Sequence, residues 1–184
     1  MARKRPAGAT LAEDLRGITG HAFGDLALAE LALTHSSALR ASDNNERLEF
    51  LGDRVLGLVV SELLFRLYPE AREGDLAVRL GSLVSADTCA EIALELGLDR
   101  YVRTDSALRS AGGRRARNVL ADAVEALIAA IYLEGGLEAA RAFVLRCWEP
   151  RAETVGRLPR DSKTELQEWV VRINGERPLY AVVG

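Results

Sequence analysis

Apolar residues recur at helical spacing along most of the chain, and glycine and proline residues separate the apolar runs. Pro69 closes one long run, Gly97 closes the next, and the pair at residues 135–136 divides a third. From this pattern we expect short helices within residues 11–40 and long helices at about residues 44–68, 73–96, 114–134 and 137–148.

The composition changes after the last of these helices. Pro150, Gly156 and Pro159 stand among charged residues, which is typical of a linker. A capping-box pattern, a short helical run and an expected strand at residues 179–183 follow. Because one helix and one strand cannot bury a core, we interpret them as the start of a truncated second domain. The expected organisation is an N-terminal tail at residues 1–10, a helical domain at 11–148, a linker at 149–160 and an incomplete domain at 161–184.

Composition narrows the possible functions. The chain has 184 residues, of which 48% are hydrophobic and 5% aromatic, and its net charge is −3. This balance excludes a uniformly basic nucleic-acid binder and argues against a base-stacking platform. Cys89 and Cys147 lie far apart and the chain has only two histidines, which argues against a zinc site. We find no signal peptide or membrane span, and we expect a soluble cytoplasmic protein.

The helix expected after residue 44 carries acids on one face. At about 100° per residue, Glu46, Glu49 and Asp53 fall together, opposite the apolar stripe. Glu49 and Asp53 are like charges one turn apart, and neither has a basic residue one turn away. A face built for solubility would normally interleave Lys or Arg, whereas a face that binds a divalent cation would not. A solvated surface is the alternative interpretation, and Glu46 can also complete a capping pattern with Asp43.

A second helix shows the same arrangement. Asn118, Asp122 and Glu125 share one face, and Arg115 lies on it one turn earlier. Two acidic faces could meet across a cleft only with compensating cations, because carboxylates that are brought together repel. Mg²⁺ prefers such oxygen ligands, and nearby arginines suit a phosphodiester substrate. Spacing alone leaves a metal site and a solvated surface both open.

The sequence NERLEFLGDRVL at residues 45–56 resembles the signature motif of the ribonuclease III family. Further segments resemble the family in the same order: the T-H-S-S segment at residues 34–37, the acidic turn at 72–74, the second acidic block at 118–126 and, at 161–168, the opening of its double-stranded-RNA-binding domain. The resemblance implies an all-α endonuclease domain, a helical bundle that works as a homodimer, followed by the first helix and strand of an incomplete α+β RNA-binding domain.

The resemblance also assigns roles to individual residues. It implies Mg²⁺, for which Mn²⁺ can substitute, as the cofactor, with no organic cofactor. The implied ligands are Glu49, Asp122 and Glu125, and the implied catalytic residues are Asp53 and Glu125. The remaining implied roles are secondary cleft acids for Glu46 and Glu73, a dimer contact for Phe50, and RNA binding for Arg115, Lys163 and Gln167.

The implied reaction is cleavage of double-stranded RNA to 5′-phosphate and 3′-hydroxyl ends with short 3′ overhangs. The implied role is processing of ribosomal RNA precursors and other structured transcripts. Two alternatives stay open from the sequence: a catalytically inactive relative that binds RNA or dimerises, and an unrelated helical interaction protein. The nuclease hypothesis requires the two acidic helix faces to meet in the folded chain.

Overall fold

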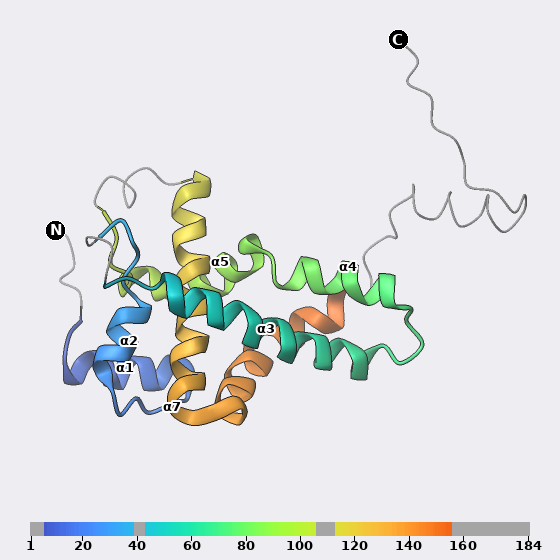
Figure 1. Cartoon of the computed structure of the whole chain (residues 1–184), viewed down its shortest axis with the longest axis horizontal. Helices are drawn as coiled ribbons and strands as arrows, with labels where there is room; N and C mark the ends of the chain where they lie inside the picture. The colour runs from blue at the N-terminus through green and yellow to red at the C-terminus, as the bar shows by residue number, and fades with distance from the viewer. Residues whose placement is uncertain (1–5, 39–42, 106–112, 156–184) are drawn as a thin grey trace, which may run out of the picture.

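The computed structural model describes residues 6–38, 43–105 and 113–155 (Figure 1). The regular secondary structure of these residues is helical, with one isolated bridge between Thr34 and Arg103 and no β-strand among them. The all-α class expected for residues 11–148 is therefore confirmed, whereas the incomplete domain expected at residues 161–184 lies outside the described residues. The elements are α1 (Ala9–Thr19), α2 (Leu26–Ala32), α3 (Glu46–Leu67), α4 (Glu73–Leu83), α5 (Ala86–Glu95), the 3₁₀ turn η1 (Leu98–Arg100) and α7 (Gly113–Val155).

Helices α3 and α7 form the centre of the fold. Figure 1 shows the first half of α7 crossing α3 steeply, with α1 and α2 near one end of α3 and α4 near the other. The apolar stripe of α3 is fully buried at Leu56 and Val59, and it joins the core to which Val124 and Leu127 of α7 also belong. Burial of these side chains is the main favourable contribution to packing the two helices together.

The long element α7 consists of two helices joined at a glycine. Gly136 has φ 74° and ψ −175°, a backbone conformation that residues with a side chain rarely adopt. The predicted break at residues 135–136 is therefore confirmed. The second helix continues through Pro150 to Val155, so residues 149–155 are helical where composition predicted a linker. The hydroxyl of Tyr68 donates to the Ala152 carbonyl at 2.6 Å and ties this last turn to the end of α3.

The expectation of one helix over residues 73–96 is wrong. The chain breaks between α4 and α5, where Ser85 is extended and its side chain accepts a hydrogen bond from the Thr88 backbone N–H at 3.3 Å. Such a cap satisfies a donor that the first turn of α5 leaves free. The apolar periodicity continues across the break, which is why it predicts one helix.

The capping interpretation of Glu46 is also wrong. Helix α3 begins at Glu46, so its N-cap is Asn45 and not Asp43. The Glu46 backbone N–H donates instead to the side-chain oxygen of Asn44 at 3.0 Å. The Glu46 side chain is exposed.

Candidate metal centre

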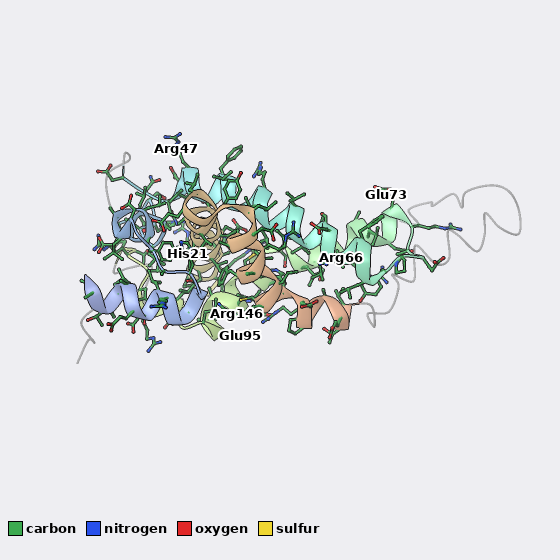
Figure 2. The ribbon with its side chains drawn as sticks, turned by 90° about the horizontal axis from the view of Figure 1, so that it is seen from below. His21, Arg47, Arg66, Glu73, Glu95 and Arg146 are labelled. Atoms are coloured by element: carbon green, nitrogen blue, oxygen red, sulfur yellow. The ribbon has the colours of Figure 1, made fainter. Side chains whose placement is uncertain are left out.

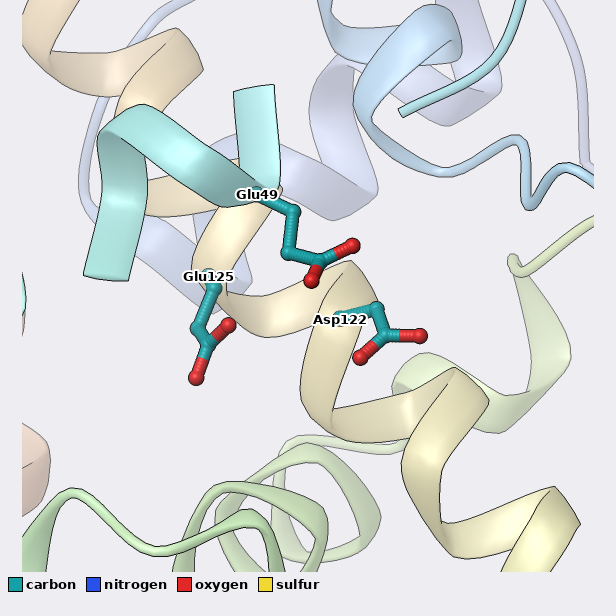
Figure 3. A group of neighbouring side chains, drawn as sticks. All are labelled: Glu49, Asp122 and Glu125. Carbon is teal, nitrogen blue, oxygen red and sulfur yellow. The ribbon is translucent and has the colours of Figure 1, made fainter. Parts of the chain in front are cut away.

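Three carboxylates from two helices meet in the folded chain. Glu49 comes from α3, and Asp122 and Glu125 come from α7 (Figure 3). One oxygen of each lies within 4.8 Å of the others, and all three residues are half-buried. The structure therefore brings the two acidic faces together, as the nuclease hypothesis requires.

A missing side chain makes this meeting possible. Gly52 lies one turn after Glu49, where the backbones of α3 and α7 touch. A Cβ atom at Gly52 would stand 1.8 Å from the carbonyl oxygen of Glu125. Only glycine permits this approach, which places Glu49 beside the carboxylates of α7.

The pKa values of the three carboxylates are raised above their ordinary values. Burial, followed by the charges of Asp53, Glu49 and Asp122, raises the pKa of Glu125 to about 8. Burial raises the pKa of Asp122 to about 6. The pKa of Glu49 is also raised, by burial first and then by Asp122 and Glu46. Burial is the largest cause of all three shifts, and neighbouring carboxylates add to it at Glu49 and Glu125, so negative charge is disfavoured in the cluster.

The part of the chain that the structure describes does not supply that cation. None of its arginines lies within 4.0 Å of a carboxylate oxygen of the cluster. The nearest basic group is the His35 ring, whose Nε2 is 3.7 Å from Asp122 Oδ2. Burial lowers the pKa of His35, which favours its neutral form. Three carboxylates without a charge partner form a donor set that suits a hard divalent cation such as Mg²⁺.

Asp53 lies beside the cluster and is more open. Its side chain is 43% exposed, and its Oδ2 accepts from Arg54 Nη1 at 2.7 Å. Arg54 directly follows Asp53 in the chain, so it is not among the residues one turn away, where the acidic face has no basic residue. Asp53 is still close enough to raise the pKa of Glu125 and of Glu49. Its catalytic role stays a prediction.

The secondary acids lie in different places. Glu46 is at the first position of α3, next to the cluster, and its charge contributes to the raised pKa of Glu49. Glu73 begins α4 at the other end of α3, which is roughly 30 Å long. Figure 2 shows Glu73 far along the molecule from Arg47, a residue in the first turn of α3. Glu73 therefore cannot join the cluster of its own chain.

The other predicted contacts lie at the surface. Phe50 is 63% exposed, with the Arg54 guanidinium 4.1 Å from its ring centroid. Arg115 is exposed at the start of α7, whereas Arg117 is engaged by Asp87 of α5 at 3.2 Å. Lys163 and Gln167 lie outside the described residues.

Two neighbours of the cluster were not predicted. His35 faces Asp122, and the Sγ of Cys89 on α5 lies 3.7 Å from Glu125 Oε1 as a weak hydrogen-bond donor. The T-H-S-S segment offered a signal for His35, because a histidine outside any helical stripe needs a polar partner. Nothing in the sequence distinguishes Cys89 from an ordinary core cysteine.

Known proteins share this fold. A family model described as Ribonuclease-III-like matches residues 25–150. Ribonuclease 3 of Brucella canis is 55% identical over 166 residues, which are 90% of this chain and 68% of that protein. Ribonuclease 3 of Bartonella bacilliformis is 51% identical over 172 residues, which are 93% of this chain and 73% of that protein.

Solved structures agree. The nuclease domain of ribonuclease III from Campylobacter jejuni superposes with a TM-score of 0.70 at 42% identity, over 76% of this chain and 94% of that one. A second structure of that domain is described as flexible in a region involved in dimer formation. Dicer from Pichia stipitis superposes with a TM-score of 0.59 at 29% identity, over 87% of this chain and 73% of that one.

The helical fold and the carboxylate cluster together define a nuclease domain. The chain belongs to the ribonuclease III family, and it is an endoribonuclease that hydrolyses phosphodiester bonds. None of the helices in the described ranges combines the length and apolar character needed to cross a membrane.

Proposed function

We propose that the chain is a Mg²⁺-dependent endoribonuclease that cleaves double-stranded RNA, leaving 5′-phosphate and 3′-hydroxyl ends with short 3′ overhangs. Its cellular substrates would be ribosomal RNA precursors and other structured transcripts. The observation that supports this proposal best is the meeting of Glu49, Asp122 and Glu125 within 4.8 Å of one another, with no arginine of the described chain beside them.

Glu49, Asp122 and Glu125 would hold the metal ion, and Mn²⁺ would substitute because oxygen ligands suit both ions. A bound ion would supply Lewis-acid chemistry, namely a lower pKa for the attacking water and stabilisation of the negative charge on the leaving 3′-oxygen. Metal binding requires Glu125 to release the proton that its raised pKa retains at neutral pH. Asp53, the more open acid, would face the substrate at the edge of the cluster.

The test of this site is the substitution Glu125→Gln. Glutamine keeps the shape of the side chain and cannot take up the negative charge that the cluster disfavours, so the variant should fold at least as stably as the parent chain. We expect Mg²⁺-dependent cleavage of a labelled RNA duplex to be lost, and the parent chain to be inactive in EDTA. Glu153→Gln, an exposed position on the same element, is the matched control.

Two outcomes would contradict the proposal. One is a Glu125→Gln variant that cuts the duplex at the parent rate, which would remove the cluster from the reaction. The other is a folded parent chain that binds the duplex without cutting it in Mg²⁺, which would identify an inactive relative.

We also propose that the chain acts as a homodimer through the exposed face of α3. Phe50, Leu58 and Phe65 are 63%, 54% and 71% exposed, and their spacing places them on one side of the helix. Exposed large apolar groups that gather in this way mark an association surface. A dimer would also give Glu73 its predicted place in a cleft, since that residue is remote from its own cluster.

The oligomeric state tests this surface. Phe50→Ala should raise the dimer dissociation constant in sedimentation equilibrium by at least about tenfold. The reason is that a large aromatic side chain buried between two subunits is the kind of residue that dominates an interface. Leu133→Ala is the control: it removes an apolar side chain that is 53% exposed and belongs to α7 instead of α3. Equal effects of the two substitutions would argue against the α3 face.

A further inference from the structure

The T-H-S-S segment at residues 34–37 is held rigidly beside the metal centre. The His35 backbone N–H donates to the Arg103 carbonyl at 2.9 Å, next to the bridge between Thr34 and Arg103. The Asn45 N–H, just before α3, donates to the Thr34 carbonyl at 2.9 Å, and the Asn45 side chain is fully buried. The segment is therefore fixed both to the start of α3 and to the loop after η1.

The surroundings of the His35 ring select one tautomer. The Ser37 backbone N–H lies 3.1 Å from His35 Nδ1, and a backbone N–H can only donate. Nδ1 must therefore be the acceptor, and in the neutral ring the proton then resides on Nε2. The Ser37 hydroxyl lies 2.8 Å from the same nitrogen and 2.9 Å from Thr104 Oγ1, and it accepts from the Asp105 N–H at 3.2 Å.

The protonated nitrogen faces the metal centre. His35 Nε2 lies 3.7 Å from Asp122 Oδ2, and the charge of Glu49 also acts on the ring. This separation is slightly longer than a direct hydrogen bond, and a small side-chain movement or one bridging water would complete the contact. Among the described residues, no side-chain donor makes a direct hydrogen bond to Asp122, and the His35 ring is the only basic group within 4.0 Å of its carboxylate.

We propose that His35 is a positioning residue, which directs its Nε2–H at Asp122 and fixes the orientation of that metal-ligand carboxylate. The inference rests on the proposed metal centre and adds a chain of contacts from Ser37 through the His35 ring to Asp122. Outer groups of this kind orient metal ligands, and their loss typically weakens metal affinity about 10- to 100-fold.

The tautomer can be measured without any variant. The chain contains only two histidines, His21 and His35, so the side-chain ¹⁵N spectrum of histidine-labelled protein has few signals. We expect the His35 ring at about pH 8, above the ordinary histidine pKa of about 6.5, to carry its proton on Nε2. A His35→Ala spectrum assigns the signals. A proton on Nδ1 would overturn the proposal.

Metal binding is the second readout, measured as calorimetric titration of the full chain with Mg²⁺ and as binding of Mn²⁺ by electron paramagnetic resonance. His35→Ala should bind Mg²⁺ at least about tenfold more weakly. His35→Gln should recover much of the affinity, because its amide N–H can replace the Nε2–H. Ser36→Ala, in the same segment, is the matched control and should bind like the parent chain.

The outcomes separate this inference from the proposed function. If His35→Ala binds Mg²⁺ with unchanged affinity while Glu125→Gln is inactive, the positioning role is refuted and the nuclease site stands. If the parent chain binds no Mg²⁺ and cuts no duplex, the metal centre itself is refuted. If glutamine and alanine at residue 35 weaken binding equally, the donated hydrogen bond is not the cause and the proposal is wrong.

Discussion

Replacing Gly52 by alanine would place a methyl group at the point where α3 and α7 touch. The added Cβ would lie 1.8 Å from the Glu125 carbonyl oxygen and 2.5 Å from the carbonyl carbon. Both are backbone atoms, so no side-chain rotation can relieve the contact. Ordinary van der Waals separation begins near 3.4 Å, so the two helices would have to move apart by roughly 1.5 Å.

This displacement has two measurable effects. Overpacking a core typically costs about 1–3 kcal/mol, and a collision with backbone belongs at the upper end, so we expect Gly52→Ala to lower the free energy of unfolding by about 3 kcal/mol. The same movement carries Glu49 away from Asp122 and Glu125. Because a misplacement of about 1 Å at a reacting centre can cost about 100-fold, cleavage should fall by about that factor or more.

Urea denaturation and cleavage of a labelled RNA duplex in Mg²⁺ measure the two effects. Gly17→Ala is the control, since Gly17 lies inside α1 with nothing within 4 Å of its added Cβ. That substitution should raise stability by about 0.4–1 kcal/mol and leave cleavage unchanged. A Gly52→Ala chain with parent stability and parent activity would refute the close approach of α3 and α7.

Three further predictions concern single groups. The stability of the metal-free protein should fall as the pH rises from about 5 to about 8, because folded Glu125, whose pKa is raised to about 8, holds a proton that the unfolded chain has already released. Thermal denaturation in EDTA at several pH values should show this fall, and Glu125→Gln should reduce it. Cys89 and Cys147 should react with a thiol reagent only after unfolding, since burial raises the pKa of both; fast labelling of the native chain would contradict this. Ser85→Ala should cost about 1 kcal/mol in urea denaturation through loss of the α5 cap, and an unchanged midpoint would disprove the cap.

Much of the fold is readable from local patterns. The apolar period predicts α3 and both halves of α7, and Gly136 marks their junction, because helix formation and glycine backbone freedom are local properties. The break at Ser85 is not readable in this way, since the apolar spacing continues across it. The helix through Pro150 is also missed, because its buried side and its contact with Tyr68 come from tertiary packing.

The sequence by itself determined which face of each helix is acidic, because side-chain direction on a helix follows from residue spacing alone. Only the tertiary structure decided that Glu49 meets Asp122 and Glu125, because that contact depends on two backbones touching at Gly52. It also decided that Arg54 turns toward Asp53 and that His35 reaches Asp122 from a separate segment. Contacts between distant segments depend on how the helices pack, and residue spacing along one helix does not tell where a second helix lies against it.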